Sequence, residues 1–548
     1  MTYDNAGRIL TRTFPSAPAE NMTFVYDAIA SGNAGKGRLT STTHEGGSVA
    51  LVYDARGNVT RDTRVVGGFT YVTDFAYDAA DNLSLVTYPS GRQVEYLRDS
   101  MGRVATVRTR KPSTGAWSNV ATAIVYQPLS TIVKSFTHGN GLATTNTHTL
   151  DYELSRCQVT DGALSLIDKS YARSDKLNIT AITDAAVPSN SLALGYNKSN
   201  RLQSAAGPWG SKTYTYDGTG NRTSEVTGSV TDTLGYPGGS NRISSVVTGT
   251  TTTRTFTHDG AGNITTDVRS GSTYTFGYNA RGRLATAHQD GNLKGTYTYN
   301  SLEQLASRVV TNAGPFNGTI HTTQDRSGNI ISEADGTTGV VSREYIWLPV
   351  AGYAGTDLPV GVVDVAGSAT PELLYVHADH LSRPIRLTDA AKVTAWAVEW
   401  LPWGGVHSIT GSETLNARFP GQWFQVESGL HYNWHRHYDP TIGRYTQPDP
   451  LGFVDGPSVY AYARNAPGEF VDPEGKSVWG WPVVRTAAAA CYRTLFAQSS
   501  GWLNANRYLR LGEGRKGGEV VFRAAGSAVE RFTGRKHIDF WWIRSLNK

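Results

Sequence analysis

The last part of the 548-residue chain contains side chains that could cleave a phosphodiester. Residues 531–542 combine His537 and Asp539 with several basic and aromatic residues. A nuclease would use His537 as general base, an Arg or Lys to stabilise charge on the phosphate, and a Trp or Phe to stack a base. The alternative is structural: His537 and Asp539 would lie on one face of an edge strand, with Phe540 and Trp541 in a small core.

A second group of candidates is a pair of aspartates, each of which opens an Asp-Pro-x-Gly sequence. The two sequences are Asp449-Pro450-Leu451-Gly452 and Asp472-Pro473-Glu474-Gly475, so the aspartates lie 23 residues apart. Asp at the first position, Pro at the second and Gly at the fourth are typical of a type I turn. The residues alone therefore predict two turns, and a chemical role for the carboxylates needs further support.

The sequence favours neither cofactor nor metal chemistry. Cys157 and Cys491 are far apart, which argues against a disulfide framework and a cysteine-based metal site. The glycine-rich segment 512–518 lacks both a phosphate-binding Gly-Lys-Ser/Thr ending and a dinucleotide fingerprint. We therefore expect no cofactor and no metal ion. No run of 18 apolar residues is present, so we also expect no membrane span.

The positive charge is concentrated at the C-terminal end. The formal net charge is +5, but residues 477–548 alone hold 12 basic and 4 acidic side chains. The body of the chain is therefore slightly acidic. A compact basic module is consistent with an anionic partner such as nucleic acid. A basic surface without a polyanionic partner would have the same composition, and both interpretations stay open.

A repeated sequence indicates the elements that must position these residues. Each copy has an aromatic residue, an Asp or Asn, two or three variable residues with Gly, and then Asn or Arg with an apolar residue. Clear copies begin at Tyr3, Tyr53, Tyr77, Tyr216, His258 and Tyr278, and weaker copies lie at Tyr196, Tyr299 and Asp325. Tyr278 and Tyr299 are 21 residues apart, a spacing that suits one β-hairpin.

The residues before these turns predict an all-β fold. Tyr, Phe and Thr alternate with period two, as in residues 213–216 and 296–299, which indicates strands with one aromatic and one hydroxyl face. In the turns, Asp can accept from backbone N–H groups two residues on, and Gly and Asn tolerate positive φ. A single hairpin cannot bury its aromatic face, so neighbouring hairpins must pair into one long antiparallel sheet.

These turns resemble those of the RHS or YD-repeat proteins, which are named for the Tyr-Asp pair. More specific is the stretch beyond residue 370, which is similar to the associated core of that family. The matching sequences are Tyr375-Val376-His377-Ala378-Asp379-His380-Leu381-Ser382-Arg383-Pro384, Phe419-Pro420-Gly421-Gln422, Arg436-His437-Tyr438-Asp439-Pro440, Gly443-Arg444-Tyr445 and the two Asp-Pro-x-Gly sequences. Family members include interbacterial Rhs toxins and the C components of insecticidal Tc toxins. The resemblance implies an antiparallel sheet coiled into a hollow β-shell around a polypeptide cargo.

The resemblance also implies a self-cleaving element of the aspartyl type at the end of the core. It assigns Asp449 and Asp472 to the catalytic pair, with Arg444 as a candidate for steering or stabilising charge. Such chemistry needs two carboxylates within a few ångströms, one to activate water and one to protonate the amide nitrogen. Asp439 and Asp455 could substitute in this assignment.

The family cuts its chain one residue after the second Asp-Pro-x-Gly, which places the cleaved bond between Lys476 and Ser477. The family usually has Leu at the position of Lys476. A leucine would occupy an apolar pocket, whereas a lysine must bury its charge or point away. The departure at Lys476 concerns the cleavage point and not the identity of the core.

Beyond Lys476 the composition changes, and we expect a small α+β module. Residues 485–497 contain four consecutive alanines behind Pro482, which favours a helix. Residues 507–512 and 519–523 are typical of short strands. The chain is thus predicted to hold a repeat sheet at 1–345, an associated core at 346–476 and a basic effector module at 477–548.

The expected function is that of an RHS-type toxin whose shell encloses and delivers the C-terminal module, with a nuclease as one candidate for the effector. Expected partners are the module itself as cargo, a cognate immunity protein, secretion machinery and a nucleic-acid target. Export would follow a leaderless route from the cytoplasm, to the medium or the cell surface. Two alternatives stay open: a non-catalytic adhesive surface protein, and a truncated remnant whose few repeats leave the shell open.

Overall fold

The computed structural model describes residues 1–111, 115–128, 130–269, 271–349, 356–365, 372–478, 509–513, 519–525 and 537–543, the last three ranges as backbone. The chain divides into two compact units, Met1–Thr486 and Ala487–Lys548. No helix among these residues has the length and apolar character needed to cross a membrane. The helices in this part of the chain are single 3-10 turns: η1 Pro18–Glu20, η2 Ala30–Gly32, η3 Pro188–Asn190, η4 Gly314–Phe316 and η5 Ala463–Asn465.

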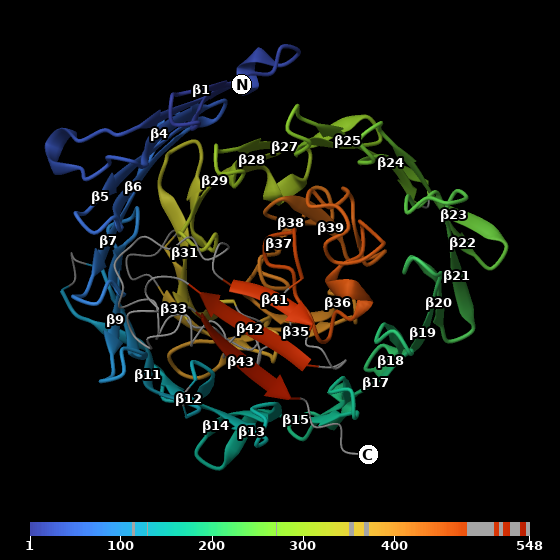
Figure 1. Cartoon of the computed structure of the whole chain (residues 1–548). Coiled ribbons are helices and arrows are strands. Elements are labelled where there is room, and N and C mark those ends of the chain that lie inside the picture. Colours follow the sequence, from blue (N-terminus) through green and yellow to red (C-terminus); the bar gives the residue numbers. More distant parts are fainter. Residues whose placement is uncertain are drawn as a thin grey trace. The chain divides into compact units, whose positions relative to one another are not determined.

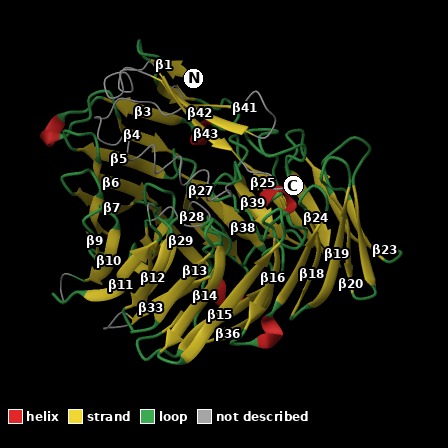
Figure 2. Ribbon diagram, turned by 60° about the horizontal axis from the view of Figure 1, so that its bottom comes forward, coloured by secondary structure: helices red, strands yellow, loops and turns green. Residues whose placement is uncertain are grey.

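The first unit is dominated by one antiparallel sheet of 36 strands, in which each strand pairs with the next along the chain. Its first 28 strands are β1 Thr2–Tyr3, β2 Ile9–Arg12, β3 Met22–Tyr26, β4 Leu39–His44, β5 Gly47–Tyr53, β6 Val59–Val66, β7 Phe69–Tyr77, β8 Leu83–Thr87, β9 Gln93–Arg98, β10 Val104–Arg110, β11 Ser118–Tyr126, β12 Val133–His138, β13 Ala143–His148, β14 Leu154–Asp161, β15 Leu164–Arg173, β16 Ile179–Asp184, β17 Leu192–Tyr196, β18 Leu202–Gly207, β19 Gly210–Tyr216, β20 Arg222–Thr227, β21 Val230–Gly235, β22 Ser245–Thr248, β23 Thr251–His258, β24 Ile264–Arg269, β25 Ser272–Tyr278, β26 Leu284–Gln289, β27 Asn292–Tyr299 and β28 Leu305–Val310. The last eight are β29 Gly318–Gln324, β30 Ile330–Asp335, β31 Val341–Leu348, β32 Leu358–Asp364, β33 Glu372–Ala378, β34 Pro384–Thr388, β35 Thr394–Trp400 and β36 Val406–Gly411. Figure 2 shows these strands lying side by side.

The repeat turns form as the sequence predicts. In one of them, Asp217 Oδ1 accepts from the backbone N–H groups of Thr219 at 2.9 Å and Asn221 at 2.8 Å. Gly220 has φ +90°, a conformation that glycine adopts without strain. The Asn differs from the expectation: instead of taking positive φ, Asn221 donates from Nδ2 to Asp217 Oδ2 at 2.8 Å and closes the turn with its side chain. The same pair of backbone bonds recurs at Asp54, Asp78, Asp99, Asn279 and Asn300.

The repeat tyrosine links one turn to the turn before it. Tyr278 Oη donates to the backbone oxygen of Ile264 at 2.8 Å, and Tyr299 Oη donates to that of Leu284 at 2.7 Å. In each case the accepting residue directly follows the preceding repeat turn. Equivalent bonds are made by Tyr53, Tyr77, Tyr126, Tyr216 and Tyr236. The hydroxyl therefore satisfies a backbone acceptor and sets each turn against its neighbour along one edge of the sheet.

The sheet forms two layers within the first unit. We call the outer layer, which includes the blue strands of Figure 1, the first course, and the inner layer, which begins at β29, the second course. Strands β29 to β33 lie inward of the blue strands in Figure 1. Alternate residues of this second course face opposite layers, as period two requires. Ile346 on β31 packs in a cluster with Val94 of the first course, whereas its neighbour Tyr345 packs in a cluster with Trp423 of the core. β32 and β33 are mostly buried along their length, which agrees with their mainly apolar sequences.

The all-β fold is confirmed, and the sheet remains open. Among the described residues, β1 pairs only with β2 and β36 pairs only with β35. The ladder continues past residue 345 and ends at Gly411. A second, smaller sheet follows, with β37 Trp423–Gln425, β38 Leu430–Asn433, β39 Arg436–Asp439 and β40 Arg444–Tyr445 antiparallel in that order. Every residue of β38, β39 and β40 is buried.

The second unit contains a three-stranded antiparallel sheet of β41 Leu509–Glu513, β42 Glu519–Ala525 and β43 His537–Ile543. The first two strands lie where the sequence predicts strands. The helix expected at 485–497 and most of the glycine-rich loop lie outside the described residues.

The contact between the repeat tyrosines and the backbone can be tested by Tyr299→Phe. Tyr299 is fully buried, and the substitution removes the hydrogen bond from its hydroxyl to the Leu284 backbone oxygen. We expect a loss of about 1–2 kcal/mol in the free energy of unfolding, measured from urea midpoints. Tyr3→Phe is the matched control, because this repeat tyrosine is 55% exposed and should lose almost nothing. Equal midpoints for both variants would contradict the assignment.

Candidate functional site

Both Asp-Pro-x-Gly sequences form turns, as predicted. The Gly452 N–H donates to the Asp449 backbone oxygen at 3.0 Å, and the Gly475 N–H donates to that of Asp472 at 3.4 Å. The turns leave both carboxylates free to point at β39. The interpretation as a turn and the interpretation as a site are therefore compatible.

One buried guanidinium, that of Arg436, bridges the two carboxylates. Its Nη2 atom lies 2.9 Å from Asp449 Oδ2 and 3.0 Å from Asp472 Oδ2. Because both oxygens contact the same nitrogen, they are held within about twice a hydrogen-bond length of each other. The three side chains are 5% exposed or less, so a charged cluster of two acids and one base lies in the interior.

Asp472 also holds the segment that follows it. Its Oδ1 atom accepts the backbone N–H groups of Lys476 and Ser477, each at 3.0 Å. The nitrogen of the Lys476–Ser477 bond therefore lies in direct contact with a carboxylate. Further along, Asp455 Oδ2 accepts the Val478 N–H at 2.7 Å, which extends this anchoring by one residue.

Two neutral groups fix Asp472 from the other side. Tyr445 Oη donates to Asp472 Oδ2 at 2.8 Å, and the Arg436 guanidinium stacks 3.5 Å above the Tyr445 ring. Asn433 donates from Nδ2 to both Tyr445 Oη and the Asp472 backbone oxygen at 2.8 Å. The carboxylate thus has little rotational freedom.

Burial dominates the electrostatics of the pair. It raises the pKa of Asp449 and of Asp472, because both carboxylates leave water. Arg436 acts in the opposite direction on both pKa values, and Tyr445 lowers that of Asp472. Repulsion between the two carboxylates is a smaller contribution. Both acids therefore hold a proton at higher pH than an exposed aspartate.

The junction approaches β38 and β39 so closely that only glycine fits. Gly475 has φ +65°, and a Cβ atom there would lie 2.4 Å from the Asn433 backbone oxygen. Arg436 Nε donates to the Gly475 oxygen at 2.6 Å. Lys476 does not bury its charge: its side chain is 27% exposed, and Nζ lies 3.5 Å from Glu474 Oε2.

The other predicted residues lie elsewhere. Arg444 is buried but faces the repeat sheet, where it donates to Asn221 Oδ1 and the Asn241 backbone oxygen. Asp439 pairs with Arg254 on β23. Burial raises the Asp439 pKa, but Arg254, Arg269 and the Thr441 hydroxyl together lower it. The cation that contacts the aspartates is Arg436. Sequence reasoning placed Arg436 in a family motif without giving it a role, because many arginines there have the same local pattern.

His537 and Asp539 lie two positions apart on β43, in register with Ala525 and Arg523 of β42. β43 is an edge strand of its sheet among the described residues. The side chains of both residues lie outside what the structure describes, as does the segment 531–536.

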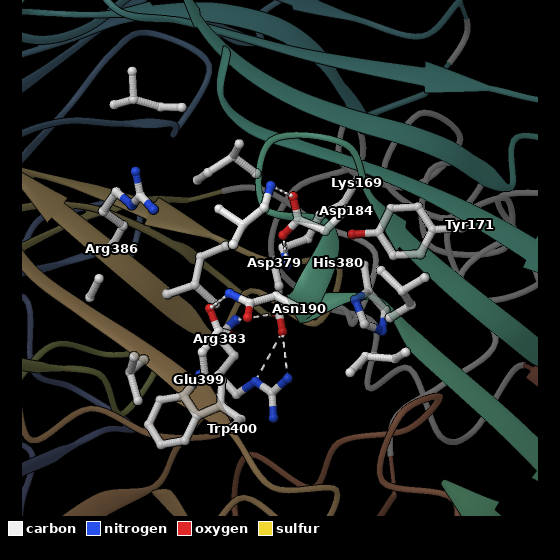
Figure 3. Close-up of a pocket in the computed structure, with 18 of the residues that line it drawn as sticks. Lys169, Tyr171, Asp184, Asn190, Asp379, His380, Arg383, Arg386, Glu399 and Trp400 are labelled. Atoms are coloured by element: carbon white, nitrogen blue, oxygen red, sulfur yellow. Dashed lines mark hydrogen bonds and ion pairs between the residues drawn. The ribbon is translucent and has the colours of Figure 1, made fainter. Parts of the chain in front are cut away.

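A pocket elsewhere in the unit is lined by residues of both courses (Figure 3). Several of its charged groups have partners within the protein: Lys169 Nζ lies 2.7 Å from Asp184 Oδ2, and Asn190 Nδ2 donates to Glu399 Oε1 at 2.6 Å. The second contact joins the first course to β35 of the second. Burial raises the Glu399 pKa.

Comparison with known proteins gives consistent matches. The family described as Teneurin YD-shell matches residues 175–457, and the family RHS Repeat matches residues 77–114. Toxin protein Tse5 of Pseudomonas aeruginosa is 40% identical over 121 residues, which cover 22% of this chain and 9% of Tse5. Double-stranded DNA deaminase toxin A of Burkholderia cenocepacia is 37% identical over 152 residues, which cover 25% of this chain and 10% of that protein. The matches thus span about a tenth of either relative.

Among solved structures, the complex TcdB2-TccC3 aligns with a TM-score of 0.70 at 17% identity. The alignment covers 86% of this chain and 26% of that chain. The similarity therefore shows a common fold for the sheet and the core.

The bridging role of Arg436 predicts a pH-dependent loss of stability in Arg436→Met. The raised folded-state pKa values mean that protonated carboxyls favour folding, so this stability is present below about pH 4 and is lost as pH rises through the folded pKa values. Without Arg436 both pKa values rise further. We expect a loss of about 3–5 kcal/mol at pH 7 and a smaller loss at pH 4, measured by chemical unfolding.

Arg418→Met is the matched control for this experiment. Arg418 is also buried, but it donates to the backbone oxygens of Leu415 and Ala417 and pairs with no carboxylate in the described part of the chain. Its replacement should destabilise equally at both pH values. The same pH-independent loss in Arg436→Met would refute the bridge.

Proposed function

The chain belongs to the Teneurin YD-shell family, and from this premise we propose that it is an RHS-type toxin shell that releases its own C-terminal module by aspartyl autoproteolysis. The bond cut would be Lys476–Ser477. The observation that carries the proposal is the position of Asp472, whose Oδ1 contacts the Ser477 nitrogen while its Oδ2 shares Arg436 with Asp449. A buried pair of carboxylates thus adjoins the proposed cleavage point.

The proposed reaction is acid–base hydrolysis of an amide. Asp449 takes a proton from water, whose oxygen forms a bond to the Lys476 carbonyl carbon. Asp472 gives its proton to the Ser477 nitrogen as the carbon–nitrogen bond breaks. Asp449 is then protonated and Asp472 ionised, and exchange with solvent restores the pair. The raised pKa of Asp472 supports its role as the acid, because burial favours its protonated form.

Arg436 and the neighbours of Lys476 support this mechanism. The Arg436 guanidinium contacts both carboxylates and can stabilise either one when it is ionised. It therefore stabilises the pair both before the reaction, with Asp449 ionised, and after it, with Asp472 ionised. It also holds the Gly475 oxygen, one residue before the proposed cleavage point. The partly exposed Lys476 side chain, paired with Glu474, needs no apolar pocket and is compatible with cleavage at this position.

We propose residues 477–548 as the effector, residues 346–476 as the associated core and residues 1–345 as the repeat region. The excess of basic residues in 477–548 supports an anionic target. A nuclease that uses His537 and Asp539 is the candidate activity. The relatives named as toxins support a toxin role. Delivery to another cell after leaderless export, with secretion machinery and an immunity protein in the producing cell, is part of the same proposal.

A non-catalytic role remains the second candidate, because both Asp-Pro-x-Gly sequences make the hydrogen bonds of ordinary turns. In that case the shell would be a structural or adhesive surface, and the chain would stay uncut.

Mass spectrometry of the purified chain separates these functions. We expect two fragments, one ending at Lys476 and one beginning at Ser477. Asp449→Asn and Asp472→Asn should each slow cleavage by about 10²–10⁴-fold, because Asn transfers no proton. Asp439→Asn is the control, since this buried aspartate pairs with Arg254 away from the junction. An intact parent chain, or cleavage that survives Asp472→Asn, would argue against autoproteolysis.

The effector is tested by expression of residues 477–548 in bacteria. We expect fewer colonies and degraded nucleic acid, and His537→Ala should restore growth because a lost general base reduces activity by about 10²–10⁴-fold. Asn547→Ala controls for expression level. If all three fragments were equally harmless, the nuclease proposal would be withdrawn.

A further inference from the structure

Arg444 is a buried cation without a carboxylate partner in the described part of the chain. It is 3% exposed. Its acceptors are neutral: Nη1 contacts Asn221 Oδ1 and Tyr236 Oη, each at 3.2 Å, and Nη2 contacts the Asn241 backbone oxygen at 2.7 Å. Burial lowers the Arg444 pKa. Burying an unpaired charge is destabilising, so packing alone does not account for an arginine here.

The acceptors of Arg444 belong to the strands and turns of residues 1–345, which we call the wall. Asn221 closes the turn between β19 and β20, and its Nδ2 contacts Asp217 and Asn241. Its Oδ1 is left for the core, and it accepts from both Arg444 and Ser458. The turn also accepts from the core through its backbone, because Asn465 Nδ2 donates to the Gly220 oxygen at 2.8 Å.

Neighbouring turns hold the core in the same manner. Tyr460 Oη donates to the Gly262 oxygen at 2.7 Å, and Gln447 Nε2 donates to the Gly282 oxygen at 2.6 Å. The Ile264 N–H donates to the Thr446 oxygen at 2.9 Å. Backbone groups at the turns of several repeats thus form hydrogen bonds with the segment that carries Asp449.

Arg444 and Tyr445 form β40, and consecutive residues of a strand point to opposite sides. Arg444 points to the wall, while Tyr445 donates to Asp472 Oδ2. A shift of β40 away from Asn221 would therefore displace the Tyr445 hydroxyl from Asp472.

We propose that Arg444 is a positioning residue that couples the wall turn at Asn221 to the carboxylate of Asp472 through Tyr445, so that the junction becomes competent for cleavage only when this part of the wall has formed. The inference rests on the proposed autoproteolysis. It assigns a regulatory task to a repeat turn more than 200 residues before the cleaved bond. Release of the C-terminal module would then occur only after this part of the wall has folded.

The first test follows the rate of cleavage of the refolded full chain. Arg444→Met and Asn221→Ala should each slow it by about 10- to 100-fold, the effect of a small misplacement at the reacting groups. Asn58→Ala is the matched control: Asn58 makes the same contacts to the aspartate of its turn and to the next turn, and none of them involves the core. Asn58→Ala should cleave like the parent.

The pH profile separates positioning from a general loss of folded protein. The Tyr445 hydroxyl lowers the Asp472 pKa, so its displacement raises that pKa and keeps the acid protonated to higher pH. Arg444→Met should therefore move the alkaline limit of cleavage upward, and Tyr445→Phe should move it in the same direction. The double variant should show no larger shift than either single variant. A reduced yield with an unmoved profile, or independent effects of the two variants, would overturn the proposal.

A stability cycle keeps the coupling measurable apart from cleavage. Asn221→Ala and Arg444→Met should lose less stability together than the sum of their separate losses, because they break the same contact. Additive losses would refute the link between wall and core. A parent chain that is never cut would instead overturn the proposed function and, with it, the regulatory role, even if the cycle shows coupling.

Discussion

The core depends on the ion pairs between the buried guanidinium of Arg436 and the carboxylates of Asp449 and Asp472. Two carboxylates in a dry interior repel each other and lose their hydration, so without a cation between them they would take up protons or separate. Arg436 contacts Asp449, Asp472 and the Gly475 backbone, and thereby joins both turns to the junction. The arrangement leaves the acids protonated more readily than usual while keeping them in one place, a condition that acid–base chemistry on an amide requires.

The repeat sheet also positions the core. Repeat tyrosines such as Tyr278 and Tyr299 tie their turns to the preceding turns, so these turns follow one another in a regular row. Regular spacing makes their backbone oxygens available to the core at Gly220, Gly262 and Gly282. The contacts are made by groups that every repeat possesses. A repeat architecture can therefore present a long, specific docking edge without a special sequence at each position.

The second course explains how a sheet of this length buries its surface. A single antiparallel layer would expose one face, but strands such as β31 and β32 pack against the first course on one side and against the core on the other. Alternation of side chains lets one strand serve both interfaces. The core sheet, whose strands β38, β39 and β40 are entirely buried, is thus held by the inner course and by the turns of the outer one.

Local sequence determined the period-two strands, the Asp and Gly chemistry of the repeat turns and the two Asp-Pro-x-Gly turns, since each depends on residues within a few positions of one another. It also pointed to Asp449 and Asp472 through a family motif. Tertiary structure alone decided that Arg436, and not Arg444, contacts them. Arg444 and Tyr445 are adjacent, and period two sends them to opposite sides, but which side faces the wall depends on contacts with residues more than 200 positions away. No local pattern carries that information.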